Sequence, residues 1–248
     1  MSTPLIQFVG VQKAFGPKVI YDDLSLDIFK GETIVILGGS GSGKSVLLKI
    51  LIGLLEPDAG EVRIDGKNVA HGSEDDFLPI RKRISMLFQG GALFDSISVA
   101  ENVAYPLREH SALSDDAIDA RVREALARVG LAGSEHLSPS DLSGGMKKRA
   151  ALARAIVAEP EVLLYDEPTT GLDPANTRRI SELILQIQRD LKVTSIVVTH
   201  DMPCAFLVGD RIAMLHDRRV RLAAPVDAFK HTQDPVIKDF IYAMEPQK

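Results

Sequence analysis

A glycine-rich segment that ends in lysine and serine carries the strongest chemical signal in the sequence. It reads Gly38-Gly39-Ser40-Gly41-Ser42-Gly43-Lys44-Ser45 and fits the pattern G-x-x-x-x-G-K-[ST]. Glycines let backbone N–H groups approach phosphate oxygens, and a helix that begins here adds unpaired N–H donors and the positive end of its dipole. We predict that this loop, continued by Val46, cradles the phosphates of ATP, with Lys44 on the β- and γ-phosphates and Ser45 on Mg²⁺.

The alternative for this segment is a flexible turn of glycine and serine. The apolar residues 33–37 before it predict a buried strand, and the residues after it predict a helix. A phosphate loop requires this order of strand, loop and helix. Nucleotide binding is therefore the preferred interpretation.

Two adjacent carboxylates, Asp166 and Glu167, follow the apolar residues 162–165. Phosphoryl transfer needs one carboxylate to hold Mg²⁺ and another group to orient the attacking water. Adjacent residues at the end of a strand diverge, so the pair can divide these tasks. We expect Asp166 to hold the metal through water and Glu167 to polarise the nucleophilic water. The alternative is that Asp166 and Glu167 are two solvated acids on the surface. Taken alone, the pair would favour this alternative, but the phosphate loop elsewhere in the sequence favours the catalytic interpretation.

Ser143, Gly144 and Gly145 form a second candidate anion site. If they open a helix, a hydroxyl, free backbone N–H groups and a dipole end gather at one point. Taken alone, these residues are more simply explained as an ordinary helix N-cap.

The order and spacing of these motifs resemble the nucleotide-binding subunit of ABC transporters. The family signature is LSGGQ, and Leu142-Ser143-Gly144-Gly145-Met146 departs from it at the last residue. The resemblance covers nearly the whole chain. It implies that Ser143, Gly144 and Gly145 grip the γ-phosphate of ATP bound to a second copy, so that two copies sandwich two ATP. Because Met146 replaces the glutamine of the signature, the resemblance does not imply a side-chain contact with the sugar of ATP here. The implied contact with the γ-phosphate is unaffected.

Further site residues follow from the same resemblance. His200 ends the apolar run 195–199 and resembles the switch histidine, which touches the γ-phosphate and helps to fix the attacking water. Gln89 resembles the Q-loop glutamine, which approaches Mg²⁺ and links the core to the helical region. Asp173, after Gly171 and Leu172, resembles part of the D-loop, which crosses the dimer interface. Without the resemblance, His200 would be interpreted as a structural histidine, Gln89 as an exposed loop amide and Asp173 as the start of a helix.

An aromatic residue that stacks on adenine is also implied by the resemblance. Phe15 precedes Lys44 by 29 residues and fits that position. Phe8 or Tyr21 could serve instead, and Phe15 could be an ordinary core residue.

Hydropathy patterns predict the elements that position these residues. Runs that are apolar on both faces are typical of buried parallel strands, and alternation with helical patterns favours an α/β fold. We expect buried strands at residues 33–37, 162–165 and 195–198, and short antiparallel strands at residues 5–11, 20–28 and 61–65, with a turn at Asp65-Gly66. We expect helices from residue 43 until Pro57, over residues 146–158, after Asp173-Pro174, and over residues 231–248.

The fold class that these patterns and the resemblance imply is a P-loop NTPase of the ABC type. It has a mostly parallel core sheet, an antiparallel β subdomain and a helical subdomain. We expect one domain over residues 1–248. Its parts are a core of residues 1–90 and 160–225, a helical subdomain of residues 91–159 with the signature, and a C-terminal helical tail of residues 226–248.

Composition limits the class of protein. The 248 residues include 29 basic and 34 acidic side chains, which gives a formal charge of −5. No apolar run approaches the roughly 20 residues that span a bilayer, and no secretory signal is visible. One cysteine, Cys204, excludes an internal disulfide framework and a multi-cysteine metal site. We expect a cytosolic protein that does not bind nucleic acid and that needs a separate permease.

Residues 90–109, with Gly144 to Arg149, resemble the ATPase subunits of bacterial Mla/Mce-type lipid transporters. The resemblance implies phospholipid transport between the inner and outer membranes. It implies as partners a transmembrane permease, a Mce-domain protein and a small STAS-type regulator, at the cytoplasmic face of the inner membrane. The alternatives are the ATPase of a transporter for another small substrate, or a non-transport ABC ATPase in DNA repair, translation or cell-division control.

Two basic triplets, residues 81–83 and 147–149, are best explained as solvated helix faces. A contact with phosphate or a lipid headgroup is the alternative.

Overall fold

A six-stranded, mostly parallel sheet forms the centre of the molecule, in a computed structural model that describes residues 3–244. The strand order is β10-β9-β3-β8-β7-β6, and β10 alone runs antiparallel to its neighbour. The strands are β3 (Thr33–Gly38), β6 (Ile84–Leu87), β7 (Val162–Asp166), β8 (Thr194–Thr199), β9 (Arg211–His216) and β10 (Arg219–Pro225). The expected buried strands are confirmed, because every residue of β3, β7 and β8 is buried.

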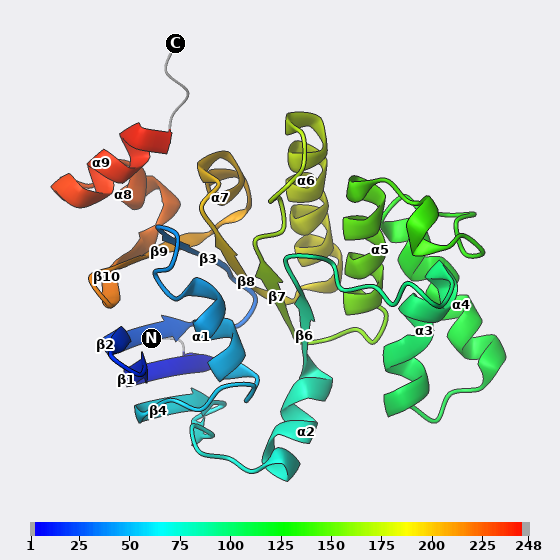
Figure 1. Cartoon of the computed structure of the whole chain (residues 1–248), viewed down its shortest axis with the longest axis horizontal. Coiled ribbons are helices and arrows are strands. Elements are labelled where there is room, and N and C mark those ends of the chain that lie inside the picture. Colours follow the sequence, from blue (N-terminus) through cyan, green and yellow to red (C-terminus); the bar gives the residue numbers. More distant parts are fainter. Residues whose placement is uncertain (1–2, 245–248) are drawn as a thin grey trace.

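A second, antiparallel sheet has the order β2-β1-β4-β5. Its strands are β1 (Ile6–Phe15), β2 (Lys18–Ile28), β4 (Ala59–Ile64) and β5 (Lys67–Asn68). Ile64 pairs with Lys67 across the expected Asp65-Gly66 turn, and both turn residues have positive φ, as a two-residue hairpin of this kind requires. The predicted α/β class, with a mostly parallel sheet beside an antiparallel one, is therefore confirmed (Figure 1).

Helices cover the parallel sheet and extend to one side of it (Figure 1). They are α1 (Lys44–Leu51), α2 (Glu74–Arg83), α3 (Val99–His110), α4 (Asp115–Arg128), α5 (Gly144–Ile156), α6 (Pro174–Leu191), α7 (Met202–Val208), α8 (Val226–Lys230) and α9 (Pro235–Met244), with a short 3₁₀ turn at Pro139–Asp141. Within residues 3–244, no helix is both long and apolar enough to cross a membrane.

Alternate residues of the parallel strands face two different hydrophobic cores. Ile34 and Ile36 of β3 join a core shared with α1 and the antiparallel sheet. Val35 and Leu37 of the same strand join a core shared with α3 to α7. Strands with two apolar faces are buried between layers, which keeps the backbone of the sheet dry and its register fixed.

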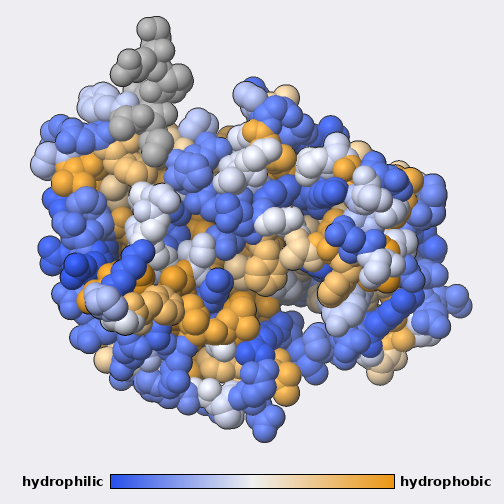
Figure 2. Space-filling model, viewed as in Figure 1, coloured by the Kyte–Doolittle hydropathy of each residue, from blue (hydrophilic) through white to orange (hydrophobic). Residues whose placement is uncertain are grey.

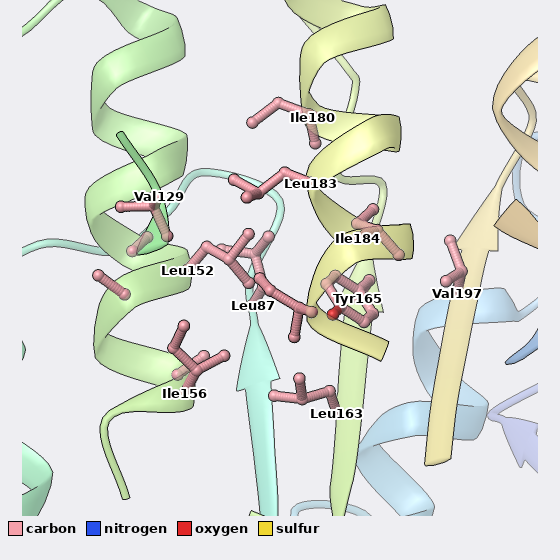
Figure 3. Close-up of a cluster of buried hydrophobic side chains, with 14 of the residues drawn as sticks. Leu87, Val129, Leu152, Ile156, Leu163, Tyr165, Ile180, Leu183, Ile184 and Val197 are labelled. Atoms are coloured by element: carbon pink, nitrogen blue, oxygen red, sulfur yellow. The ribbon is translucent and has the colours of Figure 1, made fainter. Parts of the chain in front are cut away.

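Side chains of α5 and α6 fill the second core against β6, β7 and β8 (Figure 3). Asp173 caps α6 by accepting a hydrogen bond from the backbone of Asn176, with Pro174 as the first helical residue, as expected from the sequence. Ile180, Leu183, Ile184 and Ile187 form the buried apolar face of α6, and Leu191 at its end is only partly buried. The face of the molecule in Figure 2 is mainly hydrophilic at its edge, and hydrophobic residues gather toward its middle.

The bounds of three expected helices were wrong, and the first antiparallel strand runs to Phe15, beyond its expected end at residue 11. Helix α1 ends at Leu51, well before Pro57, because Gly53 adopts a positive φ and stops the helix. Helix α5 begins at Gly144 and ends at Ile156, where residues 146–158 were expected. The tail is not one helix from residue 231: α8 ends at Lys230 and α9 begins at Pro235. Residues 245–248 of the expected tail lie outside the described residues.

Replacing Leu152 with alanine should lower the free energy of unfolding by about 2–5 kcal/mol. Leu152 is fully buried between α5 and the sheet, so truncation leaves a cavity that the surrounding side chains cannot fill. Urea unfolding is followed by far-UV circular dichroism, because the chain has no tryptophan. Leu78→Ala, at an exposed position of α2, is the control. Equal losses for both variants would contradict the assignment of Leu152 to the core.

Candidate functional site

The carboxyl ends of four parallel strands bring the predicted chemical groups together. β3 leads into the glycine-rich loop, β6 into Gln89, β7 into Glu167 and β8 into His200. Leu37 pairs with Thr199, and Asp166 pairs with Val198. This register puts the residues that follow the strands at one edge of the sheet, where ligands of open α/β sheets bind.

A cleft of about 820 Å³ opens at this edge. It is lined by Phe15, Lys18, Ile20, Gly39, Ser40, Gly41, Gly43, Lys44, Ser45, Val46, Gln89, Glu167 and His200. The lining therefore includes most of the predicted loop and three predicted residues from other strand ends. Gly38 and Ser42 do not line the cleft, and Asp166 lies behind Ser45.

Lys44 is held across the glycine-rich loop. Its Nζ donates to the carbonyl oxygens of Gly38 at 2.9 Å and Gly39 at 3.3 Å, and lies 3.4 Å from Oε1 of Glu167. The side chain is buried, so little water competes for its charge. A phosphate that enters the loop offers this ammonium stronger acceptors than two backbone carbonyls.

Strand β2 of the antiparallel sheet packs against the glycine-rich loop at Gly43. The hydroxyl of Tyr21 donates to the carbonyl of Gly43 at 2.5 Å. Gly43 has a φ of 101°, and a Cβ there would lie 2.6 Å from Ile20 Cγ2. Only glycine fits between this backbone and β2, so the loop's shape depends on the second sheet.

Ser45 and Asp166 offer oxygen atoms that suit Mg²⁺. The Ser45 hydroxyl donates to Oδ1 of Asp166 at 2.7 Å, and Gln89 lines the same cleft. Mg²⁺ in nucleotide sites commonly takes one or two protein oxygens and completes its shell with phosphates and water. The residues present fit that requirement. Among residues 3–244, no group of three or more histidine, cysteine or acidic residues could hold a metal by itself.

Glu167 is fixed by several groups around it. His200 Nδ1 lies 2.9 Å from Oε2, and the same oxygen accepts from the hydroxyls of Thr170 at 3.2 Å and Thr199 at 3.5 Å. Its backbone N–H donates to the carbonyl of Val198 at 2.9 Å. The φ angle of Glu167 is 49°, which is unusual for a residue other than glycine. Such a strained residue persists only where its neighbours hold it, which is typical of a functional site.

Phe15 lies at the other end of the cleft. Its side chain is 46% exposed, and the ammonium of Lys13 lies 5.4 Å from the ring centre. Asp58 accepts from that ammonium at 2.7 Å. The alternatives for base stacking are excluded, because Phe8 and Tyr21 are buried and do not line the cleft. Phe15 is not an ordinary core residue either.

Ser143, Gly144, Gly145 and Asp173 do not line the cleft of their own chain. The Ser143 hydroxyl accepts from the backbone of Met146 at 3.3 Å and caps α5. Gly145 packs against Asn176, where a Cβ would lie 2.8 Å from the amide oxygen. Hydrogen bonds from Asn176 hold the pKa of Asp173 below its usual range. The two predicted interface motifs therefore lie together, apart from the nucleotide cleft.

Lys148 is a residue that the sequence analysis missed. The interpretation of residues 147–149 as a solvated helix face was wrong for it, because Lys148 is buried. Its ammonium donates to the carbonyl oxygens of Gln89 and Glu167. The available signal was helical spacing, since Lys148 lies three residues after Gly145 and four before Leu152, both on the buried face of α5.

A family model described as ABC transporter matches residues 21–170. The intermembrane phospholipid transport system ATP-binding protein MlaF of Escherichia coli K12 is 40% identical over 96% of this chain and 88% of its own. MlaF of Haemophilus influenzae is 41% identical over 97% of this chain and 91% of its own length. A Mycobacterium leprae protein named "Probable ribonucleotide transport ATP-binding protein mkl" is 42% identical over 95% of this chain, which spans 68% of its length.

Solved structures agree with the fold. A dimeric post-hydrolysis structure of the ATP-binding cassette MJ0796 with ADP and Pi has a TM-score of 0.81 at 32% identity and covers 89% of this chain and 98% of its own. The structure of cbiO1 from Clostridium perfringens, part of the ABC transporter complex cbiONQ, has a TM-score of 0.84 at 30% identity, covering 96% and 95%.

Replacing Lys44 with alanine should lower ATP turnover by about a hundredfold or more, because it removes a buried positive charge from the phosphate loop. Steady-state phosphate release and binding of a fluorescent ATP analogue provide the measurements. Lys49→Ala, at an exposed position of the same helix, should behave as wild type. Wild-type turnover in Lys44→Ala would disprove the assignment of the loop.

Proposed function

The chain belongs to the ABC transporter family and is an ATPase coupled to transport, and on that premise we propose that two copies bind two ATP between them and drive a permease that moves phospholipids. The observation that carries the proposal is the convergence of Lys44, Glu167 and His200 in one cleft. A buried ammonium beside an oriented carboxylate is the arrangement that hydrolysis of a phosphoanhydride requires.

Each residue of the cleft has a task in the proposed hydrolysis. The oxygen of water attacks the γ-phosphorus, and the bond to the β,γ-bridging oxygen breaks to give ADP and phosphate. Glu167 accepts a hydrogen bond from the attacking water and polarises it. Lys44 stabilises charge on the β- and γ-phosphate oxygens. His200, 2.9 Å from Glu167, orients that carboxylate and approaches the γ-phosphate.

Phe15 is proposed to stack on adenine, because its exposed ring lines the cleft beyond the loop. Ser45 and Gln89 are proposed to hold Mg²⁺, with Asp166 behind Ser45 holding it through water. When bound, Mg²⁺ supplies positive charge to the phosphate oxygens. The loop residues from Gly38 to Val46 supply backbone N–H groups to the same phosphates.

A second copy is proposed to complete the site. Ser143, Gly144 and Gly145 do not line the cleft of their own chain, so the N-terminus of α5 is left free to serve the cleft of another copy. A partner that docks head to tail brings this N-terminus over the γ-phosphate. Asp173 lies beside it, at the start of α6, and belongs to the same interface. The dimeric state of the cassette MJ0796 supports this arrangement.

Phospholipid as substrate is supported by the MlaF proteins of E. coli and H. influenzae, which the chain matches over nearly its whole length. We propose a place at the cytoplasmic face of the bacterial inner membrane, held by the permease. A Mce-domain protein and a STAS-type regulator remain predictions. The mycobacterial relative favours a second candidate, a ribonucleotide as substrate of the same type of transporter.

An exposed aromatic pair is proposed as part of the contact with the permease. Phe94 and Tyr105 are 45% and 44% exposed, with ring centres 5.1 Å apart. The guanidinium of Arg154 lies 5.9 Å from the Phe94 ring and donates to the carbonyls of Gly91 and Ala92. Phe94 of the loop after Gln89 and Tyr105 of α3 therefore form an exposed apolar surface that Arg154 helps to hold in place. Such a surface suits contact with a short helix of a membrane partner.

Replacing Glu167 with glutamine should lower ATP turnover by about a hundredfold or more while ATP binding persists, because the amide cannot polarise water as a carboxylate does. Size-exclusion chromatography should then detect a dimer that ATP stabilises. Normal turnover in Glu167→Gln would show that Glu167 has another role.

The same variant serves to identify the transported substrate. The membrane complex that co-purifies with the chain is reconstituted into proteoliposomes, once with the wild-type chain and once with Glu167→Gln. Wild-type complex should transfer labelled phospholipid in the presence of ATP, and the Glu167→Gln complex should not. ATP-driven uptake of labelled ribonucleotide without lipid transfer would instead assign the second candidate.

Replacing Phe94 and Tyr105 together with serine should abolish co-purification of the permease, because the apolar contact is lost. ATP turnover of the isolated chain should stay within about twofold of wild type, since neither ring lines the cleft. Leu78→Ser, at an exposed position of α2, is the matched control and should retain the permease. Retention of the permease by the double variant would reject this surface as the docking site.

A further inference from the structure

Lys148 is a buried lysine that the proposed hydrolysis does not use. Its side chain lies on the inner face of α5 and the residue is 6% exposed. The ammonium donates to the carbonyl oxygen of Gln89 and, at 3.5 Å, to that of Glu167. One side chain of the signature helix thus contacts the backbone of two residues that face the nucleotide cleft.

This arrangement is costly for a lysine. Within residues 3–244, no carboxylate lies within salt-bridge distance of its ammonium. Burial lowers the pKa of Lys148, although the charges of Asp166 and Glu167 oppose that shift. Backbone carbonyls are weaker partners for an ammonium than carboxylates are. A lysine that only covered a helix surface would extend its charge into water.

The contacts of Lys148 connect three separate segments. Gln89 follows β6, Glu167 follows β7, and Lys148 lies close to the N-terminus of α5, which Ser143 caps. Arg154, six residues further along α5, donates to the carbonyls of Gly91 and Ala92 in the same loop as Gln89. Two cations of α5 therefore hold this loop at three carbonyl oxygens, those of Gln89, Gly91 and Ala92.

The second acceptor of Lys148 belongs to the strained residue of the site. Glu167 has a φ of 49°, and its N–H already donates to Val198. Lys148 binds the carbonyl on the other side of the same residue. The backbone of Glu167 thus has a partner at its N–H and another at its carbonyl, as a residue with unfavourable backbone angles needs.

We propose that Lys148 is a positioning residue for ATP hydrolysis: anchored on the carbonyl of Gln89, it holds the backbone of Glu167 in register with the signature helix. The carboxylate of Glu167 is then aligned with the attacking water only when α5 is seated against the strand ends. The proposal rests on the proposed function of Glu167 as the group that polarises water. For Lys148 it replaces the phosphate or headgroup contact that is the alternative for residues 147–149, because its ammonium is buried and already engaged.

Replacing Lys148 with methionine tests the proposal in the full chain. Methionine fills a similar volume but removes the charge and the donors. We expect kcat for ATP hydrolysis to fall by about tenfold to a hundredfold, because small displacements of a reacting group are costly. KM and the affinity for a fluorescent ATP analogue should stay within about twofold, since Lys44 and the loop are untouched. Lys148→Arg, which keeps a cation with several donors, should recover most of kcat.

A double variant separates positioning from a general structural effect. If Lys148 acts through Glu167, adding Lys148→Met to Glu167→Gln should slow single-turnover hydrolysis no more than about twofold further. Lys82→Met, which removes an exposed lysine from α2, is the control for loss of one positive charge and should match wild type. If Lys148→Met does not fold, Lys148→Gln takes its place in the same cycle.

Three results would overturn the proposal: a kcat within twofold of wild type, a loss confined to KM or nucleotide affinity, or a full further loss in the double variant. Failure of the proposed function has a different signature. In that case Glu167→Gln alone hydrolyses ATP normally, whatever Lys148→Met does.

Discussion

Parallel pairing of β3, β8 and β7 is the constraint on which the site depends. Each strand ends in one reactive segment, and hydrogen-bonded register puts those ends side by side. The register is fixed because both faces of these strands are apolar and buried. A slip of one residue would exchange the side chains of the two cores and separate Lys44 from Glu167. Packing of the sheet therefore sets the distances on which catalysis depends.

The two cores have different effects on the site. The core shared with the antiparallel sheet supports the phosphate loop, because Ile20 and Tyr21 of β2 press against Gly43. The core shared with α5 and α6 supports the acidic strand end (Figure 3). The cleft is lined both by Ile20 of β2 and by Glu167 after β7, so a change in either support would alter one side of it.

Much of the candidate site could be predicted from sequence because its signals are local. The phosphate loop needs its glycines next to Lys44, and the carboxylates directly follow a buried strand. The break before α9 was missed because an apolar pattern alone does not show that Pro235 starts a helix instead of interrupting one. Lys148 was missed because its partners are backbone carbonyls from distant strands, and carbonyls leave no trace in side-chain patterns. Only the three-dimensional packing of α5 brings them together.

Helix α5 connects the signature residues with the strand ends that line the cleft. Its N-terminus carries the signature residues, which do not line the cleft of their own chain, and Lys148 and Arg154 further along the helix donate to backbone carbonyls of the loop after β6. In the proposed dimer, a second copy that contacts the N-terminus of α5 would therefore also act on Lys148 and Arg154. The strained backbone of Glu167 is one of the groups so held. Nucleotide chemistry and contact between copies would then be coupled through a helix only 13 residues long.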